Sequence, residues 1–163
     1  MSKLRKQPST IKILQFIAET HGYRVTTRKK DKNQDPEEKK FLPDLVAEPF
    51  RGNGKCVFEV EASVTNNTIY KSLFSLLTAL KADTVKAYLV VPAKHVEFAE
   101  GCLKNVRSVI SHFSKTARGA NPKIKLQVLS FEDAAEHNAK AKKYVKGGKI
   151  GQPPKCSFFP RVK

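Results

Sequence analysis

Apolar residues recur along the chain with two periods, one typical of helices and one typical of strands. The helical period predicts helices at about 9–21, 66–80, 99–113 and 131–146. Alternating or continuous apolar runs predict strands at about 23–28, 41–50, 55–62, 87–91 and 124–128. The order is therefore helix, three strands, helix, strand, helix, strand, helix. This order indicates an α/β domain with a mixed sheet.

Turn and cap residues divide these elements. Arg51-Gly52-Asn53-Gly54 predicts a hairpin between the second and third strands, because Asn and Gly tolerate positive φ. Ser9 is the expected N-cap of the first helix, and Asn66 or Asn67 that of the second. The third strand, the second helix and the fourth strand are expected to form a right-handed crossover between parallel strands.

Two segments do not follow either period. The charged stretch 29–40 predicts a mobile loop. From Asn138 onward the chain carries eight basic residues and no acid, among glycines and prolines. We therefore predict a single domain at 1–146 and a basic tail at 147–163 that lies outside the fold.

The net charge of the chain indicates what kind of partner the protein binds. Lys and Arg number 31 against 15 Asp and Glu, which gives a formal net charge of +16. Such a surface favours nucleic acid, because neutralised phosphates release their counterions. Solubility alone, a place in a ribonucleoprotein particle and binding to an anionic membrane surface are the alternatives. The predicted phosphate contacts lie in two basic stretches: Arg28, Lys29, Lys30, Lys140, Lys142 and Lys143.

The chain shows no sign of secretion or of a membrane span. No apolar run approaches the ~20 residues that cross a bilayer, and no apolar core follows the basic N-terminus. The three cysteines are far apart and have neither zinc-site nor disulfide spacing. We expect a cytoplasmic protein with reduced cysteines and no membrane partner.

Three carboxylates converge in the predicted hairpin. Glu59 and Glu61 stand two apart in one strand, so they share a face of the sheet. A hairpin centred between Arg51 and Gly52 places Asp44 opposite Glu59 and on that same face. Such a cluster must be exposed, protonated, paired with lysines or bound to a cation. Mg²⁺ is a suitable cation, because it takes oxygen ligands and is commonly held by one or two carboxylates.

Pro43-Asp44, fourteen further residues and then Glu59-Val60-Glu61 resemble the motif of the PD-(D/E)XK nuclease superfamily. This superfamily includes many restriction endonucleases and Holliday-junction resolvases. The resemblance implies a restriction-endonuclease-like fold and magnesium-dependent hydrolysis of DNA phosphodiester bonds. It also implies that Asp44 and Glu59 are metal ligands, with the Val60 carbonyl as a third and Glu19 as an acid added from the first helix.

Glu61 stands where the family usually has lysine. A carboxylate there could act as the general base or as a ligand of a second metal ion. Lys71 could restore the missing positive charge, and Asn66 and Asn67 are candidate phosphate contacts. The implied reaction is in-line attack of water on a DNA phosphate, with one or two Mg²⁺ ions and no small-molecule cofactor. A homodimer is expected, because one such site cuts one strand.

Two other functions are compatible with the same residues. A binding module could retain the nuclease fold without its chemistry, since the family lysine is missing. A structural protein of a ribonucleoprotein would use only the charge and the basic tail. Metal-dependent hydrolysis separates the first from a nuclease, and preference for structured RNA would indicate the second.

Overall fold

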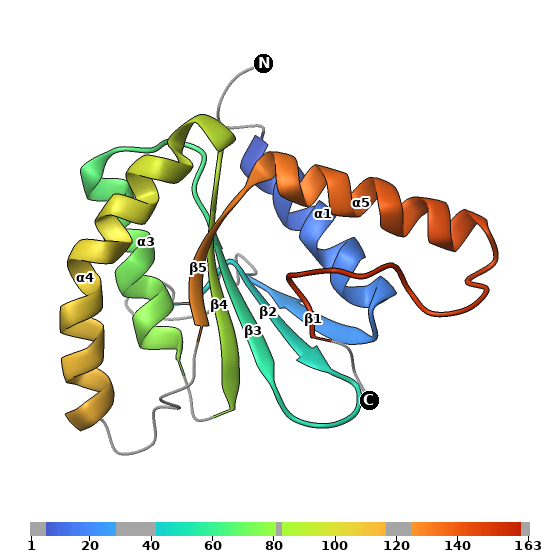
Figure 1. Ribbon diagram of the computed structural model, residues 1–163, viewed down its shortest axis with the longest axis horizontal. Helices are drawn as coiled ribbons and strands as arrows, with labels where there is room; N and C mark the ends of the chain where they lie inside the picture. Colours follow the sequence, from blue (N-terminus) through green and yellow to red (C-terminus); the bar gives the residue numbers. More distant parts are fainter. Residues whose placement is uncertain (1–5, 29–41, 81–82, 117–124, 161–163) are drawn as a thin grey trace, which may run out of the picture.

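A mixed five-stranded sheet forms the centre of the molecule (Figure 1). The computed structural model describes residues 6–28, 42–80, 83–116 and 125–160, with only the backbone described for Lys6 and for 108–116. The β1–β2 and β2–β3 pairs are antiparallel, whereas the β3–β4 and β4–β5 pairs are parallel. The strands in sheet order are β1 (Tyr23–Thr27), β2 (Leu45–Pro49), β3 (Lys55–Val60), β4 (Thr84–Val91) and β5 (Lys125–Ser130).

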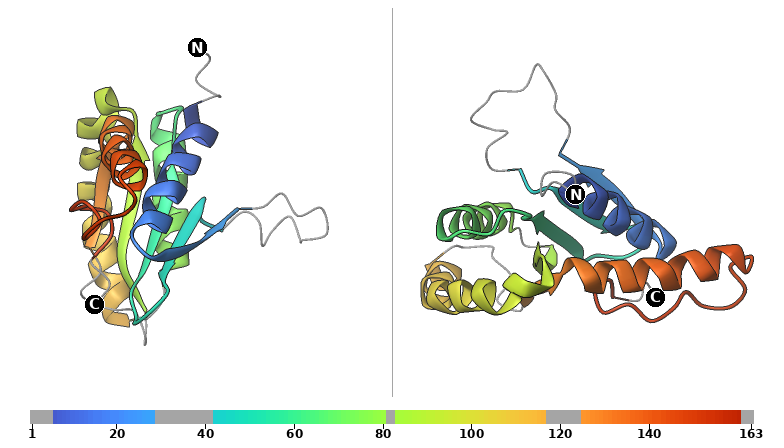
Figure 2. Two further views of the ribbon diagram at one scale, coloured as in Figure 1. Left: turned by 90° about the vertical axis from the view of Figure 1, so that its right-hand side faces the viewer. Right: turned by 90° about the horizontal axis from the view of Figure 1, so that it is seen from above.

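Helices cover both faces of this sheet (Figure 2). They are α1 (Lys6–Thr20), α3 (Asn66–Ala79), α4 (Val96–Thr116) and α5 (Phe131–Lys146), and the short 3₁₀ helix η2 (Ala93–His95) precedes α4. Helices α1 and α5 pack together on one face, and α3 and α4 pack together on the other. The predicted α/β class with a mixed sheet is confirmed. None of the helices in the described ranges has the length and apolar character that crossing a bilayer requires.

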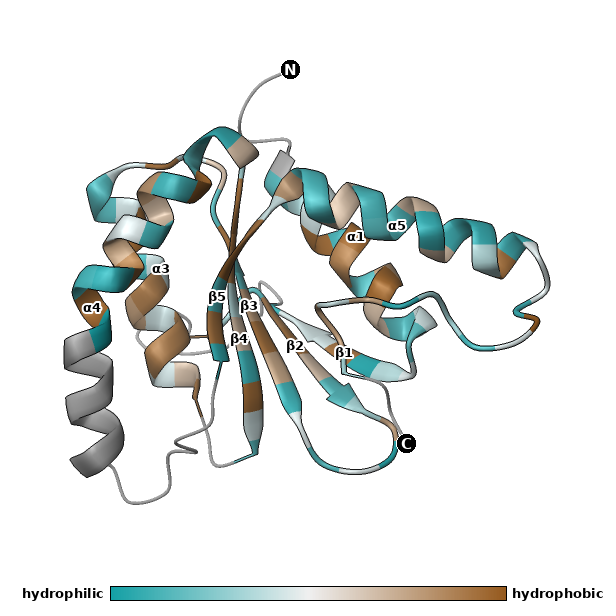
Figure 3. Ribbon diagram, viewed as in Figure 1, coloured by the Kyte–Doolittle hydropathy of each residue, from teal (hydrophilic) through white to brown (hydrophobic). Residues whose placement is uncertain are grey.

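Side-chain alternation along the central strands divides the core into two layers. In β3, Phe58 and Val60 belong to the cluster beneath α1 and α5, whereas Val57 belongs to the cluster beneath α3 and α4. Figure 3 shows the corresponding concentration of hydrophobic residues on the central strands, with a mostly hydrophilic α5. Because strand side chains alternate, Glu59 faces the same side as Val57, which is the α3 side.

The hairpin has the predicted register. Leu45 pairs with Phe58 and Ala47 with Cys56, so the next pair outward is Asp44 with Glu59. Gly52 and Gly54 adopt positive φ values of 83° and 130° in the turn, where glycine avoids the strain of a Cβ atom. The turn chemistry therefore fixes which carboxyl groups meet on the sheet.

The predicted helix caps were wrong at two positions. Helix α1 begins at Lys6, so Ser9 lies inside the helix, and Pro8 occupies the first turn, where a missing N–H is tolerated. The N-cap of α3 is Thr65, whose hydroxyl accepts from the Thr68 N–H, while the Thr68 hydroxyl accepts from the Thr65 N–H. This reciprocal pair satisfies two helix-end donors at once, which a cap at Asn66 would not do.

The predicted division at residue 146 was also wrong. Residues 147–160 run back across the α1 face, where Phe158 and Phe159 are only 1% and 2% exposed. The Phe159 ring lies 5.0 Å from that of Tyr23 and 5.5 Å from that of Phe58. The segment is therefore part of the folded domain, and burial of two aromatic rings outweighs the polar character around them. The predicted loop at residues 29–40 lies outside the described residues.

Backbone carbonyls hold the returning segment, which we call the C-terminal strap (residues 154–160). The Tyr23 hydroxyl donates to the Pro160 carbonyl over 2.7 Å, and His21 Nε2 lies 2.8 Å from the Pro154 carbonyl. The Lys86 ammonium donates to the Ser157 carbonyl at 2.8 Å, and the Tyr88 hydroxyl donates to the Phe158 carbonyl at 3.1 Å. These bonds give the strap's backbone the partners that a buried chain needs.

Candidate functional site

A polar cleft of about 160 Å³ opens on the α3 side of the sheet, where β1 and β3 end and β2 begins. Several water molecules fit in such a volume. Its wall contains the three carboxylates that the sequence predicts to converge. It also contains two predicted site cations, Arg28 and Lys71, and polar side chains from helices α1 and α3. The lining residues are Gln7, Arg28, Asp44, Glu59, Val60, Glu61, Lys71, Ser72 and Ser75.

Asp44 and Glu59 are buried side by side at the base of the cleft, each only 5% exposed. The Val60 N–H donates to Asp44 Oδ2 over 2.9 Å. The Ser75 hydroxyl, on α3, donates to Glu59 Oε1. Each carboxyl group therefore has one oxygen fixed by the protein. The two carboxyl groups also hydrogen-bond to each other, and Asp44 Oδ1 faces the Arg28 guanidinium, so a cation in the cleft would have to replace these contacts.

The pair is held under electrostatic strain. Burial, followed by the nearby Asp44 carboxylate, raises the pKa of Glu59 to about 8. The Ser75 hydrogen bond and the Arg28 guanidinium oppose this rise only in part. At neutral pH the two carboxyl groups therefore retain a proton between them unless a cation takes its place.

Glu61 lies at the mouth of the cleft and is less buried than the pair. The Ser63 N–H donates to Glu61 Oε1 at 2.9 Å, and the Ser72 hydroxyl donates to Oε2 at 3.4 Å. Burial also raises the pKa of Glu61 above its ordinary value. A carboxyl group whose pKa moves toward neutrality is suited to exchanging protons near pH 7.

Two cations border the carboxylates from different elements. Arg28 follows β1, and its Nη1 lies 3.9 Å from Asp44 Oδ1, with the side chain 37% exposed. Lys71 extends from α3 and lines the cleft as an exposed side chain. Both can contact an anion in the cleft, because guanidinium and ammonium groups keep donors for phosphate oxygens.

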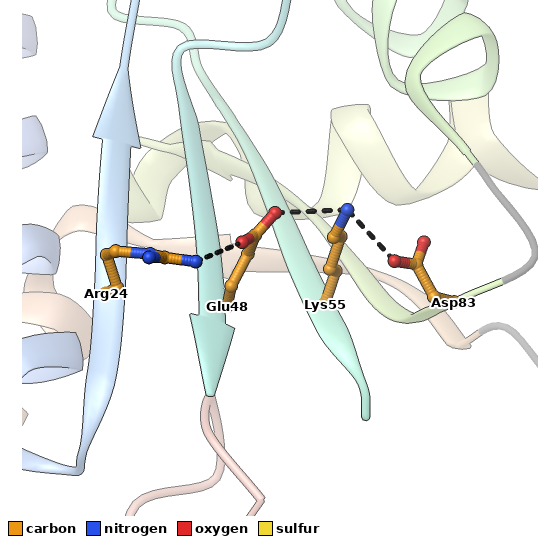
Figure 4. A network of polar contacts seen from close by, with 4 residues as sticks. All are labelled: Arg24, Glu48, Lys55 and Asp83. Carbon is orange, nitrogen blue, oxygen red and sulfur yellow. Dashed lines mark hydrogen bonds and ion pairs between the residues drawn. The ribbon is translucent and has the colours of Figure 1, made fainter. Parts of the chain in front are cut away.

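Other acids on this face of the sheet are paired with cations, as Figure 4 shows at the far end of the same strands. Glu48 contacts Arg24 at 3.2 Å and Lys55 at 3.0 Å, and Lys55 reaches Asp83 at 2.9 Å. Hydrogen bonding from Lys55 lowers the pKa of Glu48. Glu48 lies four positions after Asp44, about 13 Å away at the usual strand rise. Lysine pairing thus accounts for the carboxylates of one end, whereas among the described residues the buried pair at the other end has Arg28 as its nearest recorded cation, at 3.9 Å.

Several predicted site residues do not reach the cleft. Glu19 lies exposed in the last turn of α1 and accepts a hydrogen bond from Gln15. Gln7, twelve residues earlier in the same helix, is the α1 residue in the cleft wall, about 18 Å away by helix rise. The predicted contacts on α5, across the sheet from α3, are exposed and apart from the cleft: Lys140, Lys142 and Lys143. Lys29 and Lys30 lie outside the described residues.

Polar residues of the helices supply the part of the site that sequence reasoning missed. Ser72 and Ser75 hold Glu61 and Glu59, and both are 7% exposed. The sequence feature that could have identified the two serines is their position on the buried face of the helix, beside the apolar residues Ile69, Leu73 and Leu76. A serine there needs a polar partner. Asn66 and Asn67, in the first turn of α3, are exposed and do not line the cleft.

The donor set for a metal ion consists of oxygen atoms. Within the described ranges no group of three or more His, Cys, Asp or Glu side chains is arranged to hold a metal ion. From the described part of the chain, a cation in this cleft would therefore have at most two side-chain carboxylates. The Val60 carbonyl is a further candidate, because in the antiparallel ladder it points to the same side as the Val60 N–H, toward Asp44.

Comparisons of this chain with protein families, with characterised proteins and with solved structures gave no match.

Replacing Ser75 with alanine is expected to lower the free energy of unfolding by about 1–3 kcal/mol, because Glu59 Oε1 loses its donor while remaining buried. Urea denaturation at pH 6 measures the change. Asn67→Ala, an exposed change on the same helix, should stay within about 0.5 kcal/mol of wild type. Equal stability of Ser75→Ala and Asn67→Ala would mean that the Ser75 hydroxyl does not support Glu59.

Proposed function

We propose that this protein is a magnesium-dependent endonuclease that hydrolyses DNA phosphodiester bonds in the cleft on the α3 side, with a restriction-endonuclease-like fold. One observation carries the proposal. Asp44, immediately before β2, and Glu59, on β3, are two nearly inaccessible carboxyl groups that line a polar cleft bordered by Arg28 and Lys71. Buried acids beside exposed cations are suited to a phosphate that arrives together with a divalent cation.

The residues of the cleft fit Mg²⁺. Asp44 and Glu59 would supply carboxylate oxygens once a cation replaced the hydrogen bond between them, and the Val60 carbonyl would add a further oxygen. Mg²⁺ prefers oxygen ligands and usually keeps several waters, so two carboxylates suffice. A cation would also replace the proton that the pair retains at neutral pH. When bound, Mg²⁺ supplies positive charge beside the phosphate and makes nearby water more acidic.

The other cleft residues have separate roles in this proposal. Arg28 and Lys71 bind the phosphate from two sides and neutralise charge that develops on it. Glu61 accepts the proton of the attacking water, because its raised pKa keeps it a usable base near neutral pH. Lys71, on α3, supplies the positive charge that PD-(D/E)XK nucleases usually have at the strand position of Glu61. A homodimer would bring two such clefts to the two strands of a duplex.

Cleavage of plasmid, branched and single-stranded DNA tests the proposal. Wild type should cut at least one of them with Mg²⁺ and none with EDTA, and Asp44→Asn should cut at least 100-fold more slowly. Asp83→Asn removes a comparable charge at the far end of the sheet and should cut like wild type. Residual metal-independent cutting by Asp44→Asn would overturn the site assignment. Intact DNA binding without any hydrolysis would instead identify a binding module that retains the fold.

A further inference from the structure

The C-terminal end of α5 and the turn that follows it carry four exposed lysines. None of the four forms an ion pair with a residue that the structure describes. Lys140, one turn earlier, does pair with Glu136, at 2.6 Å. Glu136 is also the last acidic residue of the sequence. We call the four lysines the α5 basic end: Lys142, Lys143, Lys146 and Lys149.

These lysines are close enough to repel one another. Lys146 stands four positions after Lys142 and three after Lys143, and side chains at these spacings are neighbours on a helix surface. The negative end of the helix dipole favours the cations of the last turn, Lys143 and Lys146. That end is equivalent to only about half an elementary charge, so it cannot neutralise four ammonium groups. An anionic partner would remove the repulsion.

Hydrogen bonds fix the turn that carries Lys149. The Tyr144 hydroxyl lies 3.1 Å from the Lys149 carbonyl and 3.0 Å from the Gly151 carbonyl, and the Lys149 N–H donates to the Tyr144 carbonyl at 3.1 Å. Lys149 has a φ of 57°, which among the described residues no other non-glycine residue adopts in the left-handed region. Glycine would avoid the cost of this conformation, yet lysine occupies the position. The turn therefore holds an ammonium group beside those of α5.

The α5 basic end lies away from the cleft, beside the other end of α1. Gln7, near the start of α1, lines the cleft. His21, just after the end of α1, has its Nε2 atom 2.8 Å from the carbonyl of Pro154, in the segment that follows the turn. The helix from Gln7 to His21 spans about 21 Å at the usual rise. Figure 1 shows the same separation, with the C-terminal end of α5 at the side of the molecule opposite α3.

We infer that the α5 basic end is a second binding site, separate from the cleft, for the phosphate backbone of duplex DNA. The inference rests on the proposed function for the identity of the polyanion, but it concerns binding and needs no hydrolysis. Ammonium groups act as point charges on phosphate, so this site binds without reading base sequence. A duplex that occupies both sites extends roughly six base pairs or more from the cleft, at about 3.4 Å per base pair.

An anionic membrane is the other polyanion that a lysine cluster attracts. Ile150, 86% exposed, is the only large apolar side chain in the open between residues 131 and 160. One isoleucine buries less apolar surface than a myristoyl chain, which by itself binds a bilayer only weakly. Figure 3 shows that α5 is mostly hydrophilic, so the helix adds no apolar face to Ile150. These features favour DNA as the partner.

Fluorescence anisotropy in EDTA, with a labelled duplex over a series of salt concentrations, tests the inference. Replacing all four lysines of the α5 basic end with glutamine should weaken binding about 10-fold or more. It should also reduce the slope of log affinity against log salt by about three to four, because each lost phosphate contact removes nearly one unit. Glutamine is a good helix former, so the variant should keep the wild-type circular dichroism spectrum.

A control variant with the same net charge separates a binding site from charge in general. Four exposed cations on the other side of the sheet, in η2, α4 and β5, are replaced with glutamine. Acidic residues of α4, Glu97 and Glu100, lie among them in the sequence. This variant should change the salt slope by less than about one. Equal losses in the two variants would overturn the inference. The four control residues are Lys94, Lys104, Arg107 and Lys125.

Vesicles that contain phosphatidylserine test the membrane alternative. Wild type should bind them no better than the control variant does. Vesicle binding that requires both the four lysines and Ile150, with duplex affinity unchanged in the lysine variant, would assign the surface to a membrane and overturn the inference.

The two proposals fail in different ways. Duplex binding that depends on the α5 basic end, without any hydrolysis, would support the second site and remove the nuclease. Magnesium-dependent cleavage, with wild-type affinity and salt slope in the lysine variant, would do the opposite. If both proposals hold, the lysine variant should cut with a raised KM and an unchanged kcat, because its cleft is intact. Absence of any DNA binding would overturn both.

Discussion

Replacing Phe159 with alanine is expected to lower the free energy of unfolding by about 3–5 kcal/mol. The ring is 2% exposed and packs against Tyr23 and Phe58, so its removal leaves a cavity that the sheet cannot close. A domain of this kind has a total stability of about 5–15 kcal/mol, so this loss is a large fraction of the whole. The melting temperature should fall by roughly 10 °C. Guanidinium denaturation followed by circular dichroism measures both effects.

Ile150 provides the control for this change. It precedes the C-terminal strap by four residues, is also a large apolar side chain and is 86% exposed. Ile150→Ala should stay within about 0.5 kcal/mol of wild type. If Phe159→Ala also left the free energy of unfolding unchanged, residues 154–160 would not contribute to the core, as the sequence pattern predicts, and the folded domain would end at α5.

Replacing Glu59 with glutamine is expected to stabilise the metal-free protein at alkaline pH, and under the proposed function it would also abolish cleavage. The pKa of Glu59 is raised to about 8 by burial and by Asp44, so the fold favours the neutral carboxyl. The wild-type free energy of unfolding should therefore be highest below pH 4.5, as far as this group is concerned, and should fall as the pH rises through about 8. Glutamine is neutral at every pH and can still accept from Ser75.

A series of unfolding curves in EDTA from pH 4.5 to 9 measures this effect. At pH 4.5 the variant and wild type should differ by less than ~1 kcal/mol, and at pH 8.5 the variant should be more stable by about 2–4 kcal/mol. Added Mg²⁺ should restore wild type at pH 8.5 and leave Glu59→Gln unchanged, since a ligand stabilises the state that binds it. Glu48→Gln is the control, and it should gain nothing, because Lys55 lowers the pKa of Glu48. A wild type whose stability is flat between pH 5 and 8.5 would contradict the strained pair.

The elements and the carboxylate pairing could be predicted from sequence because local rules determine them. The turn at Arg51–Gly54 sets the hairpin register, and register together with strand alternation brings Asp44 to Glu59. Helix α5 occupies the predicted 131–146, where Ser130 and Asp133 form a capping box. Each of these inferences uses residues no more than about fifteen positions apart, and each is decided by backbone geometry.

What could not be predicted depends on contacts between distant segments. Phe158 and Phe159 are two adjacent apolar residues in a polar, basic stretch. Two adjacent residues show no hydrophobic periodicity, so the sequence pattern does not predict that they are buried. Their burial depends on Tyr23, Phe58 and Tyr88, which lie 70 or more residues earlier. Ser72 and Ser75 become site residues only once α3 lies beside β3. Glu19 was placed in the site by the family pattern, whereas the pitch and length of α1 present Gln7 to the cleft instead.

The C-terminal strap also determines when in its synthesis the protein can become fully folded. The Tyr23 hydroxyl donates a hydrogen bond to the Pro160 carbonyl, and the two residues are 137 positions apart in the sequence. Every residue of the cleft lies in the first half of the chain, and so leaves the ribosome well before the two phenylalanines that complete the core behind it. Contacts this far apart slow folding and leave apolar surface open while the chain is still growing. The strap makes completion of the core a late event of translation, and a chain halted before residue 158 would carry every cleft residue on an unfinished core.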